Sequence, residues 1–232
     1  MNEALAVIPA RGGSTGIPRK NLVDLGGRPL IAWTIAAASA SAATTRVVVS
    51  TDSPDIADAA RAAGAEVPFL RSRELAGGDV HAVHTVLDAL ERLERLEGYT
   101  PGIVLMLLPT APLRRAAHVD AAIAMVRADP EAPVVGVFRW NHYLTNLRYR
   151  RDGRLTPVVA AGDHNVQRQD QEPLYVVNGA MFAATPAVLR RHGSFHAPGA
   201  QAYVMPAEAS IDINDDDDLA AARAAVAGLV TA

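Results

Sequence analysis

Short aliphatic runs alternate with longer amphipathic, alanine-rich stretches along most of the chain. The aliphatic runs predict strands over Ala4–Ile8, Arg46–Ser50, Ile103–Leu108 and Val134–Phe138. The amphipathic stretches predict helices over Pro29–Ala40, Pro54–Ala63, Val80–Leu96, Ala116–Ala128 and Asp215–Val226. Strands that alternate with helices indicate βαβ units, so the pattern predicts an α/β fold with a mostly parallel sheet.

Polar or glycine-bearing segments directly follow three of these predicted strands. A glycine-rich loop follows the first strand, Thr51-Asp52 follows the second and Pro109-Thr110 follows the third. Ligands of open α/β sheets bind beyond the carboxyl ends of the strands. We therefore expect these three segments to meet at one edge of the sheet. Asp52 can face a ligand there or cap the following helix.

The alternation of strands and helices stops between Arg139 and Gln171. This stretch carries aromatic residues and arginines, and Arg151-Asp152-Gly153-Arg154 is typical of a turn between two strand-like runs. It predicts a β-hairpin arm, residues 139–171, inserted in a single domain that spans residues 1–232. Because an isolated two-stranded hairpin is marginally stable in water, the arm needs a surface to pack on, in its own subunit or in another.

Composition narrows the class of protein. The chain has 232 residues, half of them hydrophobic, which suits one domain with a full core. The formal net charge of −3 gives no electrostatic reason to expect nucleic-acid binding, and the lack of cysteine excludes disulfides and thiolate metal sites. We find neither an apolar run long enough to span a membrane nor a signal segment, so we expect a cytoplasmic protein without a membrane partner.

The segment from Pro9 to Asn21 carries the strongest chemical signal. It reads Pro-Ala-Arg-Gly-Gly-Ser-Thr-Gly-Ile-Pro-Arg-Lys-Asn, with three glycines and the cations Arg11, Arg19 and Lys20. Glycines let backbone N–H groups approach an anion, and the cations can neutralise a polyphosphate. The loop is neither a Walker A sequence nor a Gly-x-Gly-x-x-Gly fingerprint. A plain surface turn would need fewer glycines and no cluster of cations.

This loop resembles the nucleotide-binding loop of sugar nucleotidyltransferases, and more narrowly that of the acylneuraminate cytidylyltransferase family. Four further segments match the family in its order: 47–71, 107–114, 167–180 and 210–219. The resemblance implies a Rossmann-like, glycosyltransferase-A-like three-layer sandwich with a protruding dimerisation hairpin, hence a homodimer. It also implies an enzyme that transfers CMP from CTP to a sugar acid, a nonulosonic or related acid, and releases pyrophosphate.

The resemblance assigns a role to each matching position. It implies nucleotide contacts from Ala10, Arg11, Gly12, Gly13, Ser14, Lys20, Asn21 and Asp79. It implies acceptor contacts from Leu108, Arg168, Gln169, Tyr175 and Asn178. Arg11, Lys20 and Asp212 are then the catalytic residues. Asp212 and Asn214, on one face of a strand because side chains repeat every second residue, would hold Mg²⁺ or Mn²⁺.

Three positions depart from the family pattern. Thr15 replaces a lysine of the phosphate loop, Leu108 replaces a glutamine of the acceptor site, and Asn214 replaces the second metal-binding aspartate. These changes fit an enzyme with a shifted acceptor, such as another nonulosonic acid, an octulosonic acid or a phosphonate. They also fit a weakly catalytic relative that binds a nucleotide or a sugar acid. Arg11, Lys20 and Asp212, which are retained, favour an enzyme.

Overall fold

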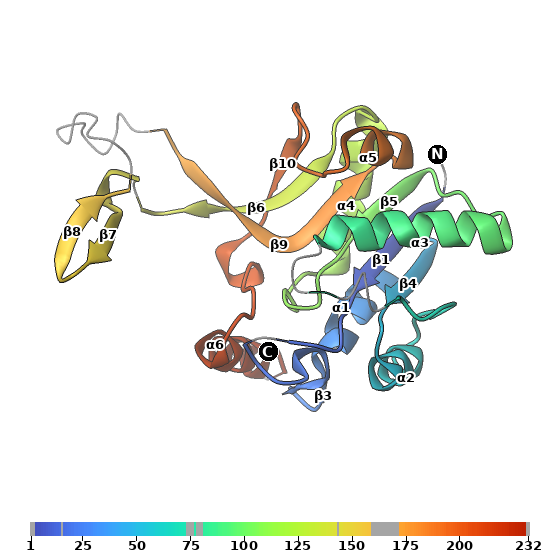
Figure 1. Ribbon diagram of the computed structural model, residues 1–232, viewed down its shortest axis with the longest axis horizontal. Helices are drawn as coiled ribbons and strands as arrows, with labels where there is room; N and C mark the ends of the chain where they lie inside the picture. The colour runs from blue at the N-terminus through green and yellow to red at the C-terminus, as the bar shows by residue number, and fades with distance from the viewer. Residues whose placement is uncertain are drawn as a thin grey trace.

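A computed structural model describes residues 3–14, 16–72, 77, 81–142, 144–158 and 172–230 of the chain. Its central sheet has six strands in the order β10-β6-β9-β5-β1-β4 (Figure 1). They are β1 (Ala4–Pro9), β4 (Arg46–Ser50), β5 (Ile103–Met106), β6 (Val134–Trp140), β9 (Leu174–Ala184) and β10 (Gln201–Val204). All neighbouring pairs are parallel except those of β9, which runs antiparallel to β5 and to β6.

Helices cover both faces of this sheet and make it the middle of three layers (Figure 1). They are α1 (Leu30–Ser39), α2 (Pro54–Ala62), α3 (Ala82–Glu97), α4 (Ala116–Ala128) and α5 (Pro186–His192), whereas α6 (Asp216–Val230) packs in a separate hydrophobic cluster. Side chains of β1 alternate between the faces: Ala6 and Ile8 pack in the cluster with α1, α2 and α4. Leu5 and Val7 pack in the cluster with α3 and α5. The three-layer α/β prediction is confirmed.

The predicted helices and strands are confirmed, with shifts at their ends. The helix over 116–128 has the expected bounds, and Ser53 caps α2 by accepting a hydrogen bond from the N–H of Ile56. The strand predicted to end at residue 108 ends at Met106, whereas the one predicted to end at Phe138 continues to Trp140. The sequence pattern does not predict β9, β10, α5 or the small hairpin formed by β2 (Asp24–Leu25) and β3 (Arg28–Pro29).

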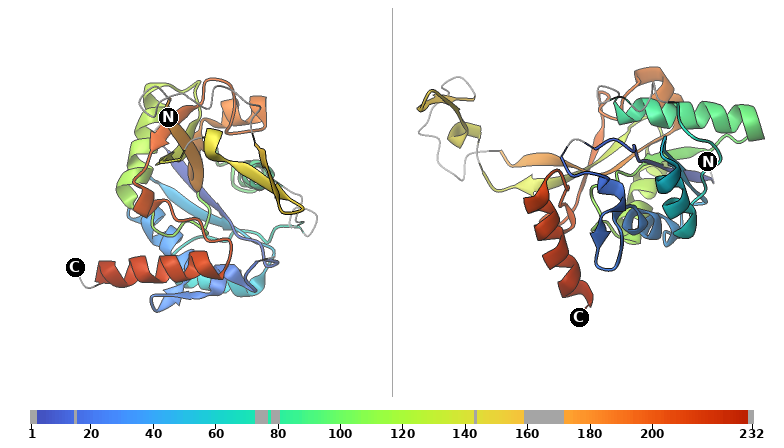
Figure 2. Two further views of the ribbon diagram at one scale, coloured as in Figure 1. Left: turned by 90° about the vertical axis from the view of Figure 1, so that its left-hand side faces the viewer. Right: turned by 60° about the horizontal axis from the view of Figure 1, so that its bottom comes forward.

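The arm leaves the body along the outer halves of β6 and β9. At its end lies an antiparallel pair, β7 (Arg148–Arg151) and β8 (Arg154–Pro157), far from the body (Figure 2). Asp152 and Gly153 both have positive φ angles, 49° and 76°, as a two-residue hairpin turn requires. The predicted turn between two paired strands is therefore confirmed, whereas residues 143 and 159–171 of the predicted arm lie outside the described residues. The stalk of the arm is made of the two long strands β6 and β9, which also belong to the central sheet.

A third, smaller hydrophobic cluster lies beside the loop that follows β1. Ile17 from that loop packs there with Ile213 and with the first and last turns of α6, through Leu219 and Val226. This cluster fixes the loop after β1 against the segment that precedes α6. None of the helices formed by the described residues is long and apolar enough to cross a membrane.

Candidate nucleotide-binding site

The segments after β1, β4 and β5 meet at one edge of the sheet, as the sequence predicts. Here a cavity of about 340 Å³ opens between the glycine loop and the start of α3. Six of its lining residues are predicted site residues: Arg11, Ser14, Lys20, Asn21, Leu108 and Asn214. The cavity is large enough for part of a nucleotide, and cations from separate segments of the chain surround it.

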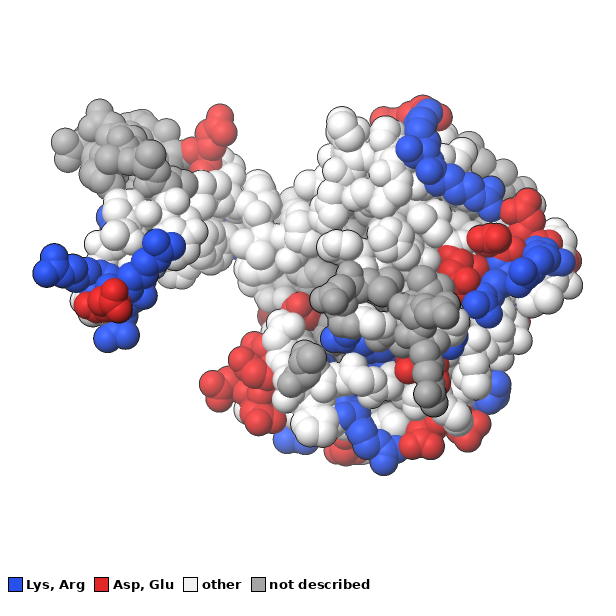
Figure 3. Space-filling view, in the orientation of Figure 1, with Lys and Arg blue, Asp and Glu red and all other residues white. Residues whose placement is uncertain are grey.

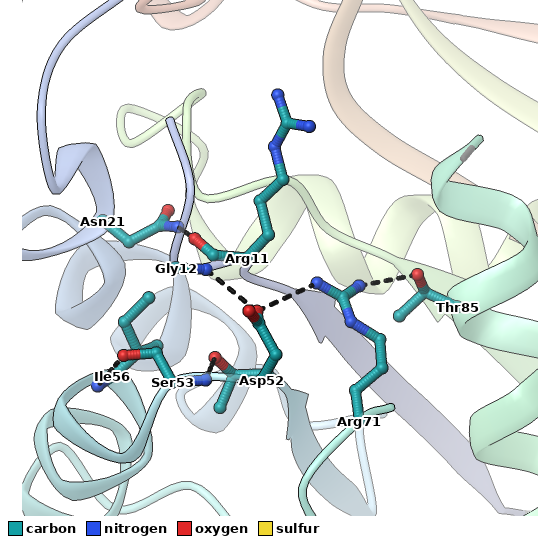
Figure 4. A network of polar contacts seen from close by, with 9 residues as sticks. Arg11, Gly12, Asn21, Asp52, Ser53, Ile56, Arg71 and Thr85 are labelled. Carbon is teal, nitrogen blue, oxygen red and sulfur yellow. Dashed lines mark hydrogen bonds and ion pairs between the residues drawn. The ribbon is translucent and has the colours of Figure 1, made fainter. Parts of the chain in front are cut away.

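Asp52 and Asn21 hold the glycine loop in place. The backbone N–H of Gly12 donates to Asp52 Oδ1 at 2.9 Å, and Asn21 Nδ2 donates to the carbonyl oxygen of Arg11 at 3.0 Å (Figure 4). Asn21 is 7% exposed, so its amide serves the loop. The sequence leaves two roles open for Asp52, to face a ligand or to cap the following helix. In the structure Ser53 caps α2, and Asp52 binds the glycine loop instead. The guanidinium of Arg11 extends away from these bonds and lines the cavity.

Arg71 lines the site, but the sequence assigns it no role beyond its place at the end of the matching segment 47–71. Its guanidinium is buried, with Nη1 donating to Thr85 Oγ1 at 2.7 Å and Nη2 lying 3.6 Å from Asp52 Oδ1 (Figure 4). Nε and Nη2 have no hydrogen-bond partner among the described residues. Burial lowers the pKa of Arg71, and the charge of Asp52 opposes that shift. Because Arg71 also lines the cavity, its positive charge adds to the attraction for an anion bound there.

The path of the chain explains how Arg71 reaches this edge. Residues 66 and 70 form parallel bridges with Val48 and Thr51, so the segment after α2 runs beside β4 to the same sheet edge. The N–H of Arg71 then donates to the carbonyl oxygen of Thr51 at 2.8 Å. The signal that could have identified Arg71 is the apolar run Val67–Leu70, because the arginine directly follows it.

Lys20 lies at the opposite wall of the cavity. Its Nζ donates to the carbonyl oxygens of Ile213 at 2.8 Å and of Asn214 at 3.1 Å. An ammonium group has three donors, so one remains for another acceptor. Lys20 therefore joins the glycine loop to the segment of Asp212 and Asn214 while it lines the cavity.

Asp212 and Asn214 lie side by side, but not on a strand, which corrects the sequence prediction. Residues 211–214 belong to no helix or strand, and the segment is held by the buried Ile213, whose N–H donates to the carbonyl oxygen of Thr110 at 2.8 Å. Asn214 Nδ2 donates to Asp212 Oδ2 at 3.3 Å, whereas Asp212 Oδ1 is buried without a partner among the described residues. A buried carboxylate oxygen without a hydrogen-bond donor fits a cation ligand.

This pair does not make a complete metal site by itself. Within the described ranges, no group of three or more His, Cys, Asp or Glu side chains is placed to hold a metal ion. An ion bound here would take one carboxylate and one amide from the chain, and its other ligands would have to come from water or from phosphate oxygens. That arrangement is usual for Mg²⁺, which keeps several waters and is bound with substrate phosphates.

Arg114 is buried behind Leu108 and does not itself line the cavity. Its three donor groups reach the carbonyl oxygens of Ala180 at 2.6 Å and Leu108 at 2.7 Å, and Thr34 Oγ1 at 2.8 Å. Burial lowers the pKa of Arg114 to about 9, against the attraction of Asp212, so the group stays charged at neutral pH. Arg114 therefore fixes the backbone of Leu108, the residue that lines the cavity where the family has glutamine.

Two predicted acceptor residues lie elsewhere. Asn178 is 2% exposed, donates to Ser210 Oγ and Met205 Sδ, and accepts from the N–H of Ala180, so its amide secures the core and does not face the cavity. Tyr175 is 47% exposed and pairs with Arg139 in the arm, outside the cavity lining. Ala10, Gly12 and Gly13 lie in the glycine loop. Thr15, Asp79, Arg168 and Gln169 lie outside the described residues.

Comparisons with known proteins agree with this geometry. The family model described as "Cytidylyltransferase" matches residues 5–175. The chain is 33% identical to CMP-N,N'-diacetyllegionaminic acid synthase of Legionella pneumophila over 222 residues, 93% of each protein. It is 30% identical to the N-acylneuraminate cytidylyltransferase of Streptococcus agalactiae serotype V over 216 residues, 92% of this chain but about half (51%) of the relative's length.

The fold comparison points the same way. The solved structure of a CMP-2-keto-3-deoxy-manno-octonic acid synthetase complexed with CTP superposes with a TM-score of 0.72 at 18% identity, covering 98% of this chain and 99% of the other. At that identity the likeness establishes the fold alone. The family-model match covers most of the chain, and the chain therefore belongs to the cytidylyltransferase family.

Proposed function

We propose that this protein transfers CMP from CTP to a nonulosonic acid and releases pyrophosphate. The observation that carries the proposal is the cavity at the sheet edge, where Arg11, Lys20 and the partly unpartnered Arg71 surround a space suited to a polyphosphate. The family match supplies the nucleotide, because it is described as a cytidylyltransferase. The relatives named for legionaminic and acylneuraminic acids supply the class of acceptor.

The reaction follows from these positions. The acceptor's hydroxyl oxygen attacks the α-phosphorus of CTP in line and a new P–O bond forms, while the hydroxyl proton passes to solvent water. The bond from the α-phosphorus to the bridging oxygen breaks, and pyrophosphate leaves with that electron pair. Such transfers depend mainly on positioning and charge neutralisation. Arg11 and the free donor of Lys20 bind phosphate oxygens, and Arg71 adds its positive charge at the cavity wall. Their charge stabilises negative charge that builds up on the leaving group.

Asp212 and Asn214 would hold Mg²⁺ or Mn²⁺ next to the phosphates. The unpartnered, buried Asp212 Oδ1 fits this role, and the amide oxygen of Asn214 is a neutral ligand where the family has a second carboxylate. A bound divalent cation would neutralise charge on the triphosphate. Leu108 offers the acceptor an apolar surface instead of an amide, which favours an acid other than N-acetylneuraminic acid.

The same proposal includes a homodimer, held by the arm. The arm exposes large apolar side chains: Tyr149 is 48% exposed, Leu155 68%, Tyr175 47% and Val177 44%. Its tip pairs only two short strands, β7 and β8, in the described part of the chain. A two-stranded tip with exposed apolar residues gains stability from a second protein surface, and a second copy of the chain is the partner that the sequence resemblance implies.

Pyrophosphate release tests the proposal most simply. The protein is incubated with CTP, Mg²⁺ and, in separate reactions, legionaminic, pseudaminic, N-acetylneuraminic and 3-deoxy-octulosonic acids. Release with one or more nonulosonic acids, dependent on both CTP and the acid, supports the proposal. Release with the octulosonic acid alone would mean that the acceptor is an octulosonic acid and not a nonulosonic acid. CTP binding without release with any acid would favour the weakly catalytic binding protein instead.

A further inference from the structure

The glycine loop and the Asp212–Asn214 segment touch at an unusually close point. Gly16 lies against the backbone of Asn214, and a Cβ built at Gly16 would overlap the carbonyl oxygen of that residue. The same carbonyl oxygen accepts one of the two hydrogen bonds from Lys20 Nζ. Ile17 and Ile213, next to these contacts, are both buried in one hydrophobic cluster. The glycine loop and the Asp212–Asn214 segment are thus joined by the Gly16 contact, by the Lys20 hydrogen bonds and by the packing of Ile17 with Ile213.

Space, and not backbone conformation, requires glycine at position 16. Gly16 is not among the glycines with positive φ, so alanine could adopt its backbone angles. The obstacle is a backbone oxygen, which cannot turn aside as a flexible side chain can. Gly13, in the same loop and also without positive φ, differs only in its surroundings, because a Cβ built there meets nothing within 4 Å.

We propose that Gly16 and Lys20 are positioning residues that set the Asp212–Asn214 pair against the nucleotide loop, so that cation and nucleotide binding are coupled. This inference rests on the proposed cation role of that pair. The missing side chain of Gly16 lets the carbonyl of Asn214 approach the loop, and Lys20 then closes the contact through two hydrogen bonds. The orientation of both side chains, one on each side of the buried Ile213, follows from that contact.

Charge and position make opposite predictions for Lys20. If Lys20 acted near the cation only through its charge, its removal would tighten cation binding, because like charges repel. If Lys20 positions the pair, its removal weakens cation binding, because the two carbonyls it holds are released. Residues that orient metal ligands from behind typically affect metal affinity 10- to 100-fold. The direction of the change therefore separates the two roles.

The test measures Mn²⁺ binding to the protein by the resonance signal of the free ion, in the absence of CTP, because CTP binds Mn²⁺ itself and its phosphates are proposed to contact Lys20. Gly16→Ala and Lys20→Met are compared with the wild type, and Gly13→Ala is the matched control. CTP binding in EDTA and the melting temperature of each variant are recorded as well. We expect Gly16→Ala and Lys20→Met to weaken Mn²⁺ binding at least about 10-fold, and Gly13→Ala to leave it within about twofold. In EDTA, Gly16→Ala should bind CTP about as well as the wild type.

Unchanged Mn²⁺ affinity in Gly16→Ala, equal weakening in Gly13→Ala, or tighter binding in Lys20→Met would overturn the coupling. Each of these results leaves the proposed function standing, provided that the wild type transfers CMP. A wild type that binds CTP but no Mn²⁺ removes both the coupling and the cation role. If Gly16→Ala fails to fold, Lys20→Met decides the question by the direction of its effect.

Discussion

The cavity at the sheet edge and the arm are incomplete in opposite ways. At and beside the cavity, buried polar atoms lack a hydrogen-bond partner among the described residues: Nε and Nη2 of Arg71 and Oδ1 of Asp212. In the arm, apolar side chains lack cover, with Leu155 68% exposed and Tyr149 48% exposed. Charged groups gather at the tip of the arm, on β7 and β8 (Figure 3).

The difference shows what kind of partner each region takes. Buried donors and a buried carboxylate oxygen are costly unless they are paired, so the cavity suits a small, highly charged ligand together with a cation. Exposed leucine and tyrosine are stabilised by contact with another apolar surface, which a small charged ligand does not offer. The arm therefore suits a protein partner. Each variant below changes one residue, either at the cavity or in the arm.

The largest effect is expected from Asp212→Asn. The substitution keeps the shape of the side chain but removes the only carboxylate of the proposed cation pair. We expect turnover to fall at least about 100-fold at saturating Mg²⁺, because a lost charge contact to the cation is worth several kcal/mol. Steady-state rates of pyrophosphate release measure it. Asp217→Asn, in the exposed acidic start of α6, is the control, and equal losses in both variants would remove the assignment.

Arg71→Leu is expected to act on nucleotide binding. Since a hydrogen bond to a charged group contributes about 1.5–3 kcal/mol, CTP affinity should fall roughly 10- to 100-fold in calorimetric titrations. The melting temperature should fall as well, because the variant breaks the buried contacts of Arg71 with Thr85 and Asp52, so CTP affinity is measured well below the onset of unfolding. Arg95→Leu, on the exposed side of α3, serves as the control. If Arg71→Leu binds CTP as tightly as the wild type, CTP does not bind beside Arg71.

Leu155→Asp tests the arm. Burying a leucine stabilises an interface by about 1.5–3 kcal/mol, so a charge at this position should weaken the dimer at least about 10-fold. Sedimentation at micromolar concentration should then show more of the 24.4 kDa species than the wild type does. Leu96→Asp, 60% exposed on α3 away from the arm, should leave assembly unchanged. A wild type that sediments only as the monomer would contradict the proposal.

The smallest effect is expected at Leu108. Leu108→Gln introduces an amide into the cavity wall, where Arg114 holds the backbone. A neutral hydrogen bond contributes about 1 kcal/mol, so the ratio of kcat/KM for N-acetylneuraminic acid over the preferred acid should rise about fivefold. Leu108→Met, without the amide, should keep the wild-type ratio. No change in either variant would separate Leu108 from acceptor choice.

Local signals in the sequence predicted the parts of the fold that depend on them. The periodicity of 116–128 gave both ends of α4, and Asp152-Gly153 gave the turn of the arm. β9 was missed because its eleven residues, Leu174–Ala184, contain Asn178-Gly179, which interrupts the strand pattern, and because it pairs with β6 in both the arm and the body but with β5 only in the body. Nothing local to that segment specifies the second pairing.

The same limit applies to the site. The glycine loop was predicted as a unit because its residues are contiguous. Arg71 was missed since its partners, Asp52 and Thr85, lie on separate segments and are brought together only by the sheet edge. Asn178 was assigned to the acceptor because a motif does not show burial, and its amide is bonded within the core. The role of Lys20 at residues 213–214 joins positions nearly a full chain apart.

The central claim is that the acceptor's hydroxyl oxygen attacks the α-phosphorus of CTP in this protein. The acid that supports pyrophosphate release is prepared with ¹⁸O in that hydroxyl and is reacted with CTP and Mg²⁺, and the products are analysed by mass spectrometry. We expect a CMP ester that carries the label, together with an equal amount of unlabelled pyrophosphate. Unlabelled CMP with the labelled acid recovered intact would mean that water, and not the acid, is the acceptor, and would contradict the account.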